Sequence, residues 1–172
     1  STCGKPTIFA TTPTKFGLSL LNIFNLGDIS MLLPTDYQPT SDALADKIIL
    51  VTGAGDGIGR QAALSFAAHG ATVILVGRTL AKLEKVYDEI EAAGGSQPAL
   101  MPLNLESASD DEYVAIANAI RETFGRLDGL LHNAGELGER TPISNYSTGA
   151  WLRCMQVNVN APFMLTKALL PL

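Results

Sequence analysis

The stretch Lys47-Ile-Ile-Leu-Val-Thr-Gly-Ala-Gly-Asp-Gly-Ile-Gly59 decides the fold of this chain. Its first half is a β-branched apolar run typical of a short buried strand. Three glycines with the spacing Gly-x-x-x-Gly-x-Gly follow, at Gly53, Gly57 and Gly59. We expect the first to permit a tight exit from the strand, the second to let an anion approach the backbone, and the third to let helix and strand pack closely. The N-terminus of the next helix would offer free N–H groups to a pyrophosphate, although such a turn can also be purely structural.

Strand and helix patterns alternate after this turn. Apolar runs occur at 47–52, 72–76, 99–103 and around 129–132, and such near-continuous runs are typical of a parallel sheet covered on both faces. A long final helix is expected at about 148–170. Helical spacing predicts three apolar faces between the runs: Ile58, Ala62, Ala63 and Phe66; Leu83, Val86, Tyr87 and Ile90; Tyr113, Ile116, Ala117, Ile120 and Phe124. The chain is therefore predicted to be α/β, with a doubly wound parallel sheet of the Rossmann type.

Composition narrows the class of protein. The chain has 172 residues, of which 47% are hydrophobic, and its net charge of -5 argues against general nucleic-acid binding. We expect no membrane partner, because no apolar segment reaches the roughly 18–20 residues that a spanning helix needs. Cys3 and Cys154 lie far apart, and His69 and His132 are isolated, so we expect no disulfide framework and no metal site. A reducing, cytoplasmic compartment is the default.

The chain divides into two regions. Residues 1–41 lack sustained periodicity and are rich in Thr, Ser, Pro and Asn. We expect them to form a flexible or non-native N-terminal arm, either upstream sequence preceding a natural start at Met31 or an ordinary arm. Residues 42–172 are expected to form the N-terminal part of a single dinucleotide-binding domain.

Three motifs carry a resemblance to a known family. Thr52–Gly59, His132-Asn-Ala-Gly135 and Val157-Asn-Val-Asn160 resemble, in order and spacing, the short-chain dehydrogenase/reductase family. The wider match, with Arg78 and Leu127-Asp-Gly129, is similar to bacterial YciK-like oxidoreductases. The resemblance implies hydride transfer between a nicotinamide cofactor and a small carbonyl or alcohol substrate. It also implies a homo-oligomer for the full-length protein.

The resemblance further implies a cofactor site. The cofactor-binding residues carried over from the family are Gly53, Gly57, Ile58, Gly59, Arg78, Asn104, Leu105, Asn133, Ala134 and Gly135. An acid after the second strand would bind the ribose hydroxyls of NAD(H), but Gly77 and Arg78 stand there, and a guanidinium suits a 2′-phosphate. NADP(H) is therefore expected over NAD(H). Asp56 in the glycine turn would not help a phosphate, and Arg78 can also be read as a solvated surface residue.

Asn158 matches the active-site asparagine of the family, which is implied to hold a water in a proton relay through its carbonyl. Pro162 lies four residues later and has no N–H, so this carbonyl loses its helical donor and a kink is expected. The alternative is a helix that merely tolerates proline near one end. His132 is expected to be a packed, hydrogen-bonded core residue, and His69 a helix cap. Packing or a subunit interface is expected for an apolar series at helical spacing: Trp151, Met155, Val159 and Phe163.

The Ser and Tyr-x-x-x-Lys pair of the family is not found. The residues four positions after the tyrosines are Ser41, Glu91, Ala117 and Ala150, and none is lysine. We therefore expect an N-terminal fragment of a reductase that is inactive by itself, with its fourth strand at an uncovered sheet edge. Two alternatives remain open: a non-catalytic dinucleotide-binding or interaction module, and an S-adenosylmethionine methyltransferase, which also uses a glycine turn.

Overall fold

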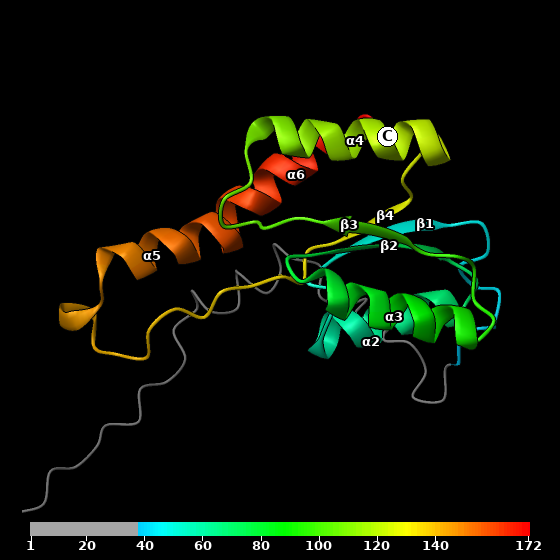
Figure 1. Ribbon diagram of the computed structural model, residues 1–172, viewed down its shortest axis with the longest axis horizontal. Helices are drawn as coiled ribbons and strands as arrows, with labels where there is room; N and C mark the ends of the chain where they lie inside the picture. The colour runs from blue at the N-terminus through cyan, green and yellow to red at the C-terminus, as the bar shows by residue number, and fades with distance from the viewer. Residues whose placement is uncertain (1–37) are drawn as a thin grey trace, which may run out of the picture. The chain divides into compact units, whose positions relative to one another are not determined.

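The computed structural model describes residues 38–172, so Cys3, Met31 and nearly all of the predicted arm at 1–41 lie outside the described residues. Strands and helices alternate from Ile48 onward, as predicted (Figure 1). The elements are β1 (Ile48–Thr52), α2 (Gly57–Ala68), β2 (Thr72–Gly77), α3 (Leu80–Ala92), β3 (Ala99–Pro102), α4 (Asp110–Phe124), β4 (Gly129–Leu131), η2 (Ile143–Asn145), α5 (Thr148–Met155), η3 (Gln156–Asn160) and α6 (Ala161–Leu169).

The strands form one parallel sheet in the order β3-β2-β1-β4. Leu50 of β1 pairs with Ile74 of β2 on one side and with Leu130 of β4 on the other. The strands β2 and β3 thus follow on one side of β1, and the chain then crosses back to add β4 on the other side of β1. This reversal creates a switch point beside β1, which is where open α/β sheets bind ligands.

Helices cover both faces of the sheet. In Figure 1, α2 and α3 lie against one face, and α4 and α6 against the other. The strand residues alternate between these layers: Val51 of β1 packs in the α2 and α3 layer, and Leu50 in the α4 and α6 layer. Both side chains are fully buried. The doubly wound Rossmann-type fold is therefore confirmed.

Most of the predicted helix faces are buried, with one exception. Leu83, Val86 and Ile90 of α3 are buried, and α4 is capped at Ser109 by a capping box and begins with its acidic run. The prediction for Ile58 was wrong, because its side chain is 80% exposed. The buried stripe of α2 consists of small residues at i, i+4 spacing (Gly59, Ala63 and Ala67), and Ile58 points about 100° away from Gly59 around the helix axis.

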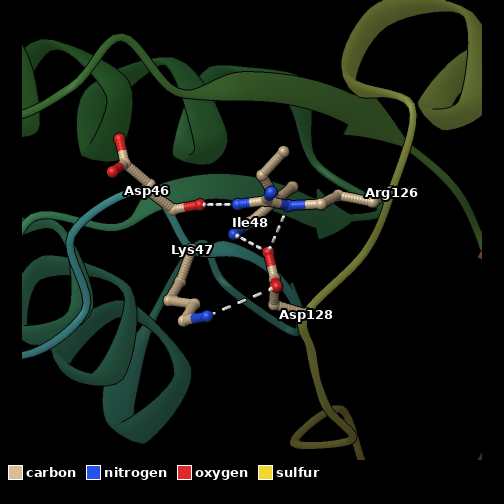
Figure 2. A network of polar contacts seen from close by, with 5 residues as sticks. All are labelled: Asp46, Lys47, Ile48, Arg126 and Asp128. Atoms are coloured by element: carbon tan, nitrogen blue, oxygen red, sulfur yellow. Dashed lines mark hydrogen bonds and ion pairs between the residues drawn. The ribbon is translucent and has the colours of Figure 1, made fainter.

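A polar network joins the beginnings of β1 and β4 (Figure 2). The carboxylate of Asp128 accepts hydrogen bonds from the Ile48 N–H at 2.9 Å and the Arg126 Nε at 3.1 Å, and it pairs with Lys47 at 3.7 Å. Arg126 also donates to the carbonyl of Asp46, whose φ of 60° is unusual for a residue with a side chain. The Ile48 N–H is the largest cause that lowers the pKa of Asp128. The network fixes how β4 enters the sheet.

Candidate functional site

A cleft of about 380 Å³ lies at the carboxyl ends of the strands, beside the switch point. Its volume is in the range of small-molecule sites, about 300–1,000 Å³. Seven residues predicted to bind a cofactor line it: Gly53, Arg78, Asn104, Leu105, Asn133, Ala134 and Gly135. Gly57, Ile58 and Gly59, also predicted, belong to the first turn of α2 and do not line this cleft.

The glycine turn has the backbone geometry that the spacing predicted. Gly53 has a φ of +67°, in the left-handed region, where it turns the chain out of β1. Gly59 lies against this turn, because a Cβ at Gly59 would come within 2.3 Å of the Gly53 carbonyl oxygen. Gly57 has a φ of +54° but no neighbour near its Cβ position, so the structure requires its backbone conformation rather than a close contact.

Thr52 organises the junction between β1 and the segment after β4. Its hydroxyl is buried and accepts hydrogen bonds from the N–H groups of Asn133 and Ala134, both at 3.1 Å. The Asn133 side-chain amide donates to the carbonyls of Thr52 at 3.2 Å and Gly53 at 3.4 Å. These bonds hold the segment from Asn133 to Gly135 against the glycine turn. Asn133 thus stabilises the floor of the cleft, and its side-chain NH2 group already donates to two backbone carbonyls.

Arg78 and Asn104 come from the ends of neighbouring strands. Arg78 directly follows β2, is exposed, and has no ion pair among residues 38–172. The Asn104 side-chain oxygen accepts from the Glu106 N–H at 3.2 Å, and the neighbouring Leu105 is buried. An amide oxygen has two lone pairs, so Asn104 keeps acceptor capacity toward the cleft.

Four charged residues that line the cleft were not predicted as site residues: Asp56, Lys82, Glu106 and Glu136. Asp56 is the N-cap of α2 and accepts from the Gly57 N–H at 2.8 Å. Lys82, in the first turns of α3, pairs with Asp56 at 2.7 Å. The hydrogen bond from Lys82 is the largest cause that lowers the pKa of Asp56, followed by the Gly57 N–H. The sequence did contain a signal for Lys82, because it lies one helical turn after Arg78, where the chain leaves β2.

Asn158 lies beside the cleft and not in its lining. Its side chain makes two hydrogen bonds of 2.8 Å to the backbone of Glu136, accepting from the N–H and donating to the carbonyl. Glu136 and Asn158 also border a second, adjacent hollow of about 560 Å³. Asn158 therefore fixes the segment that separates the two hollows. Its assignment as the active-site asparagine stays a prediction.

The predicted helix at 148–170 is interrupted at Asn158. Residues Gln156–Asn160 form a π-helical segment, and the Ala161 N–H donates to the Gln156 carbonyl five residues earlier. The proline at Pro162 supplies no N–H to the Asn158 carbonyl, which accounts for a break in the α-helical ladder here. The structure thus has a widened turn at this position. Trp151, Val159 and Phe163 remain 56%, 49% and 67% exposed, so they do not pack within the described part of the chain.

The two histidines have structural partners. His132 was predicted to be in the core, but it is exposed at the end of β4, and the edge position of that strand explains this. Its predicted hydrogen bonding is confirmed, because Nε2 lies 2.9 Å from the Thr166 Oγ1, and desolvation lowers its pKa. His69 is the C-cap of α2, as predicted, with Nδ1 at 2.7 Å from the Ser65 carbonyl.

Residues 38–172 lack two further features that would point to another function. No helix in this part of the chain is both long and apolar enough to cross a membrane. The same residues contain no group of three or more His, Cys, Asp or Glu side chains able to hold a metal ion.

The sheet order, the glycine turn and the cleft at the switch point define a Rossmann-type nucleotide-binding fold. The chain belongs to the short chain dehydrogenase family, whose model matches residues 47–172. It is 52% identical over 136 residues to the oxidoreductase YciK of Escherichia coli K12, covering 79% of this chain. A cyclohexanol dehydrogenase of an Acinetobacter strain is 38% identical over 123 residues, or 72% of this chain. The resemblance to YciK-like oxidoreductases is therefore confirmed.

Solved structures are similar as well. A short chain dehydrogenase of Shigella flexneri 2a, complexed with NADP, is 50% identical with a TM-score of 0.76 over 77% of this chain and 56% of its own. A short chain dehydrogenase of Escherichia coli CFT073, complexed with NADPH, is 51% identical with the same TM-score over 78% of this chain and 56% of its own. The chain spans about half the length of the relatives it matches, including 54% of YciK and 48% of the cyclohexanol dehydrogenase.

Proposed function

We propose that this chain binds NADP(H) in the cleft at the carboxyl ends of β1, β2 and β3, as the cofactor half of an oxidoreductase. When bound, the cofactor supplies or accepts a hydride. The residues that would hold its adenosine side are those predicted from the sequence, with Arg78 facing the 2′-phosphate. Residues 42–172 would form the N-terminal part of one dinucleotide-binding domain.

The position of Arg78 carries this proposal. It is an exposed guanidinium on the cleft, directly after β2, with no ion pair of its own among the described residues. Such a group can make two charge-assisted hydrogen bonds to a phosphate. The complexes of two relatives, each about half identical to this chain, with NADP and NADPH support the same choice of cofactor.

The residues around the cleft fit a nucleotide. The turn at Gly53 brings backbone, not side chains, to the floor, and the buried Thr52 hydroxyl holds Asn133 and Ala134 in place. The first turn of α2 presents N–H groups near this floor. Gly57, Ile58 and Gly59 would then act through the backbone of this turn. They do not line the cleft themselves but directly follow Asp56, which does.

For the whole protein we propose hydride transfer to or from a small carbonyl or alcohol, a homo-oligomeric state and a cytoplasmic location, as the family resemblance implies. Asn158 would serve the proton relay, positioned through its two bonds to Glu136. Since no tyrosine of this chain has a lysine four residues later, we propose that the chain by itself does not catalyse the transfer. A non-catalytic dinucleotide-binding module is the alternative.

Exchange of Arg78 for alanine tests the cofactor assignment. We expect Arg78→Ala to weaken NADPH binding by about tenfold, because a charge-assisted contact of roughly 1.4 kcal/mol is lost, and to leave NADH binding nearly unchanged. Fluorescence titration of both cofactors measures this. Lys85→Ala is the matched control, since Lys85 is exposed on α3 outside the cleft. Equal losses for NADPH and NADH, or no loss, would refute the role of Arg78.

A further inference from the structure

Three carboxylates line the cleft that would take the phosphorylated ligand: Asp56, Glu106 and Glu136. Within residues 38–172, Asp56 is the one of these three that has an ion pair. Asp56 lines the cleft and caps α2, with its Oδ1 at 2.8 Å from the Gly57 N–H. An uncompensated carboxylate at this point would repel the 2′-phosphate proposed to lie at Arg78, because Asp56 and Arg78 line the same cleft. A cleft that accepts a phosphorylated nucleotide therefore needs a cation that compensates Asp56.

Lys82 provides that cation. Its Nζ lies 2.7 Å from the Asp56 Oδ2, and it too lines the cleft. The hydrogen bond from Lys82 is the largest cause that lowers the pKa of Asp56, so the pair favours the ionised carboxylate. The pair thus joins the N-terminus of α2 to the first turns of α3.

The backbone is arranged to permit this pair. A Cβ at Gly55 would come within 2.9 Å of the Cβ of Lys82, so the absence of a side chain at Gly55 lets α3 bring Lys82 over the glycine turn. Arg78, in contrast, has no ion pair within residues 38–172 and remains available to a ligand. Lys82 therefore compensates Asp56, whereas Arg78 is left to bind a ligand.

We propose that Lys82 is a specificity-determining residue, which neutralises Asp56 and so lets the cleft accept a 2′-phosphate beside Arg78. This inference rests on the proposed function. Lys82 acts through Asp56, and its removal exposes the 2′-phosphate to an unpaired carboxylate. The side chains of Lys82 and Asp56 are 54% and 76% exposed, so the effect is modest and decreases as salt screens the charges.

The test uses the full chain and two small probes, 2′,5′-ADP and 5′-AMP, which differ in the 2′-phosphate. We expect Lys82→Met to weaken binding of 2′,5′-ADP by about fivefold at low salt and to affect 5′-AMP less, as measured by calorimetry. Asp56→Asn in the Lys82→Met background should restore the affinity to within about twofold, because asparagine still caps the helix but carries no charge. Asp56→Asn alone should not weaken binding of 2′,5′-ADP.

Each outcome decides the inference. A loss that Asp56→Asn repairs supports it, since a merely structural role of Lys82 would not be rescued by removing a charge. An unchanged affinity in Lys82→Met, or a loss that persists in the double variant, overturns it and leaves the proposed function standing. Failure of the folded wild-type chain to bind 2′,5′-ADP and NADPH overturns the proposed function itself.

Discussion

At the scale of single residues, the glycines of the turn could be predicted from the sequence more readily than the charged residues of the cleft. Gly53 and Gly59 are required by contacts within the turn, where a side chain at either position would meet Asn133 or the turn backbone. Such steric demands leave a clear signature in the sequence, because only glycine satisfies them. The role of a charged side chain depends instead on its neighbours in the fold. The Asp56–Lys82 pair was not predicted because it forms between the N-termini of α2 and α3, whose relative position the sequence pattern does not give.

Gly59→Ala tests the steric part of this account. Alanine normally stabilises a helix relative to glycine, but here the new Cβ would lie 2.3 Å from both the Asn133 Nδ2 and the Gly53 oxygen. We expect a loss of about 1–3 kcal/mol in the free energy of unfolding, measured by urea denaturation. The matched control is Gly149→Ala in α5, whose nearest contact is the end of the Arg153 side chain at 3.6 Å. It should gain about 0.5 kcal/mol, and a Gly59→Ala variant that is equally stable would contradict the packing argument.

At the scale of elements, the network in Figure 2 holds β4 at the edge of the sheet. β4 has three residues and, within the described part of the chain, pairs with β1 alone. The Asp128 carboxylate adds a hydrogen bond to Ile48 just where this pairing begins, and Arg126 ties the same point to Asp46. The strand therefore depends on polar contacts more than the central strands do.

This dependence predicts a pH effect. The pKa of Asp128 is lowered from 3.8 in the folded chain, so its contribution to stability is present above that pH and is lost as the pH falls through the lower folded value. We expect the melting temperature of Asp128→Asn to fall below that of wild type at about pH 6, and the difference to shrink as the pH falls below 3.8. Thermal unfolding across this range measures it. Asp88→Asn on the exposed face of α3 controls for the loss of one carboxylate, and a difference independent of pH would be the contrary result.

The elements show how far sequence patterns reach. Strand boundaries and the burial of α3 and α4 could be predicted, because apolar periodicity directly reflects two-sided burial in a parallel sheet. Ile58 was assigned to the wrong face, since the fully buried stripe of α2 consists of Gly59, Ala63 and Ala67 and the Ile58 side chain is exposed. Pro162 indicated a disturbed helix near Asn158, but a proline pattern alone does not distinguish a kink from the π-helical segment Gln156–Asn160.

At the scale of the whole molecule, the sheet order brings residues that are distant in sequence to one edge. The glycine turn, Arg78, Asn104 and the segment from Asn133 to Gly135 follow four different strands and meet at one cleft. Most of these site residues were predicted from the family resemblance. The sheet explains why they meet, because parallel strands place their carboxyl ends together. The spacing of Lys82 one helical turn after Arg78 could indicate a place near the cleft, but its pairing with Asp56 depends on how α3 packs on the glycine turn.

The most direct test of the central claim is the affinity of the folded wild-type chain for NADPH and for NADH, measured by calorimetry under the same conditions. We predict that NADPH binds at least about tenfold more tightly, because only NADPH carries the phosphate that Arg78 would bind with charge-assisted hydrogen bonds. Equal affinities, or no binding of either cofactor by folded chain, would contradict the assignment of the cleft as an NADP(H) site.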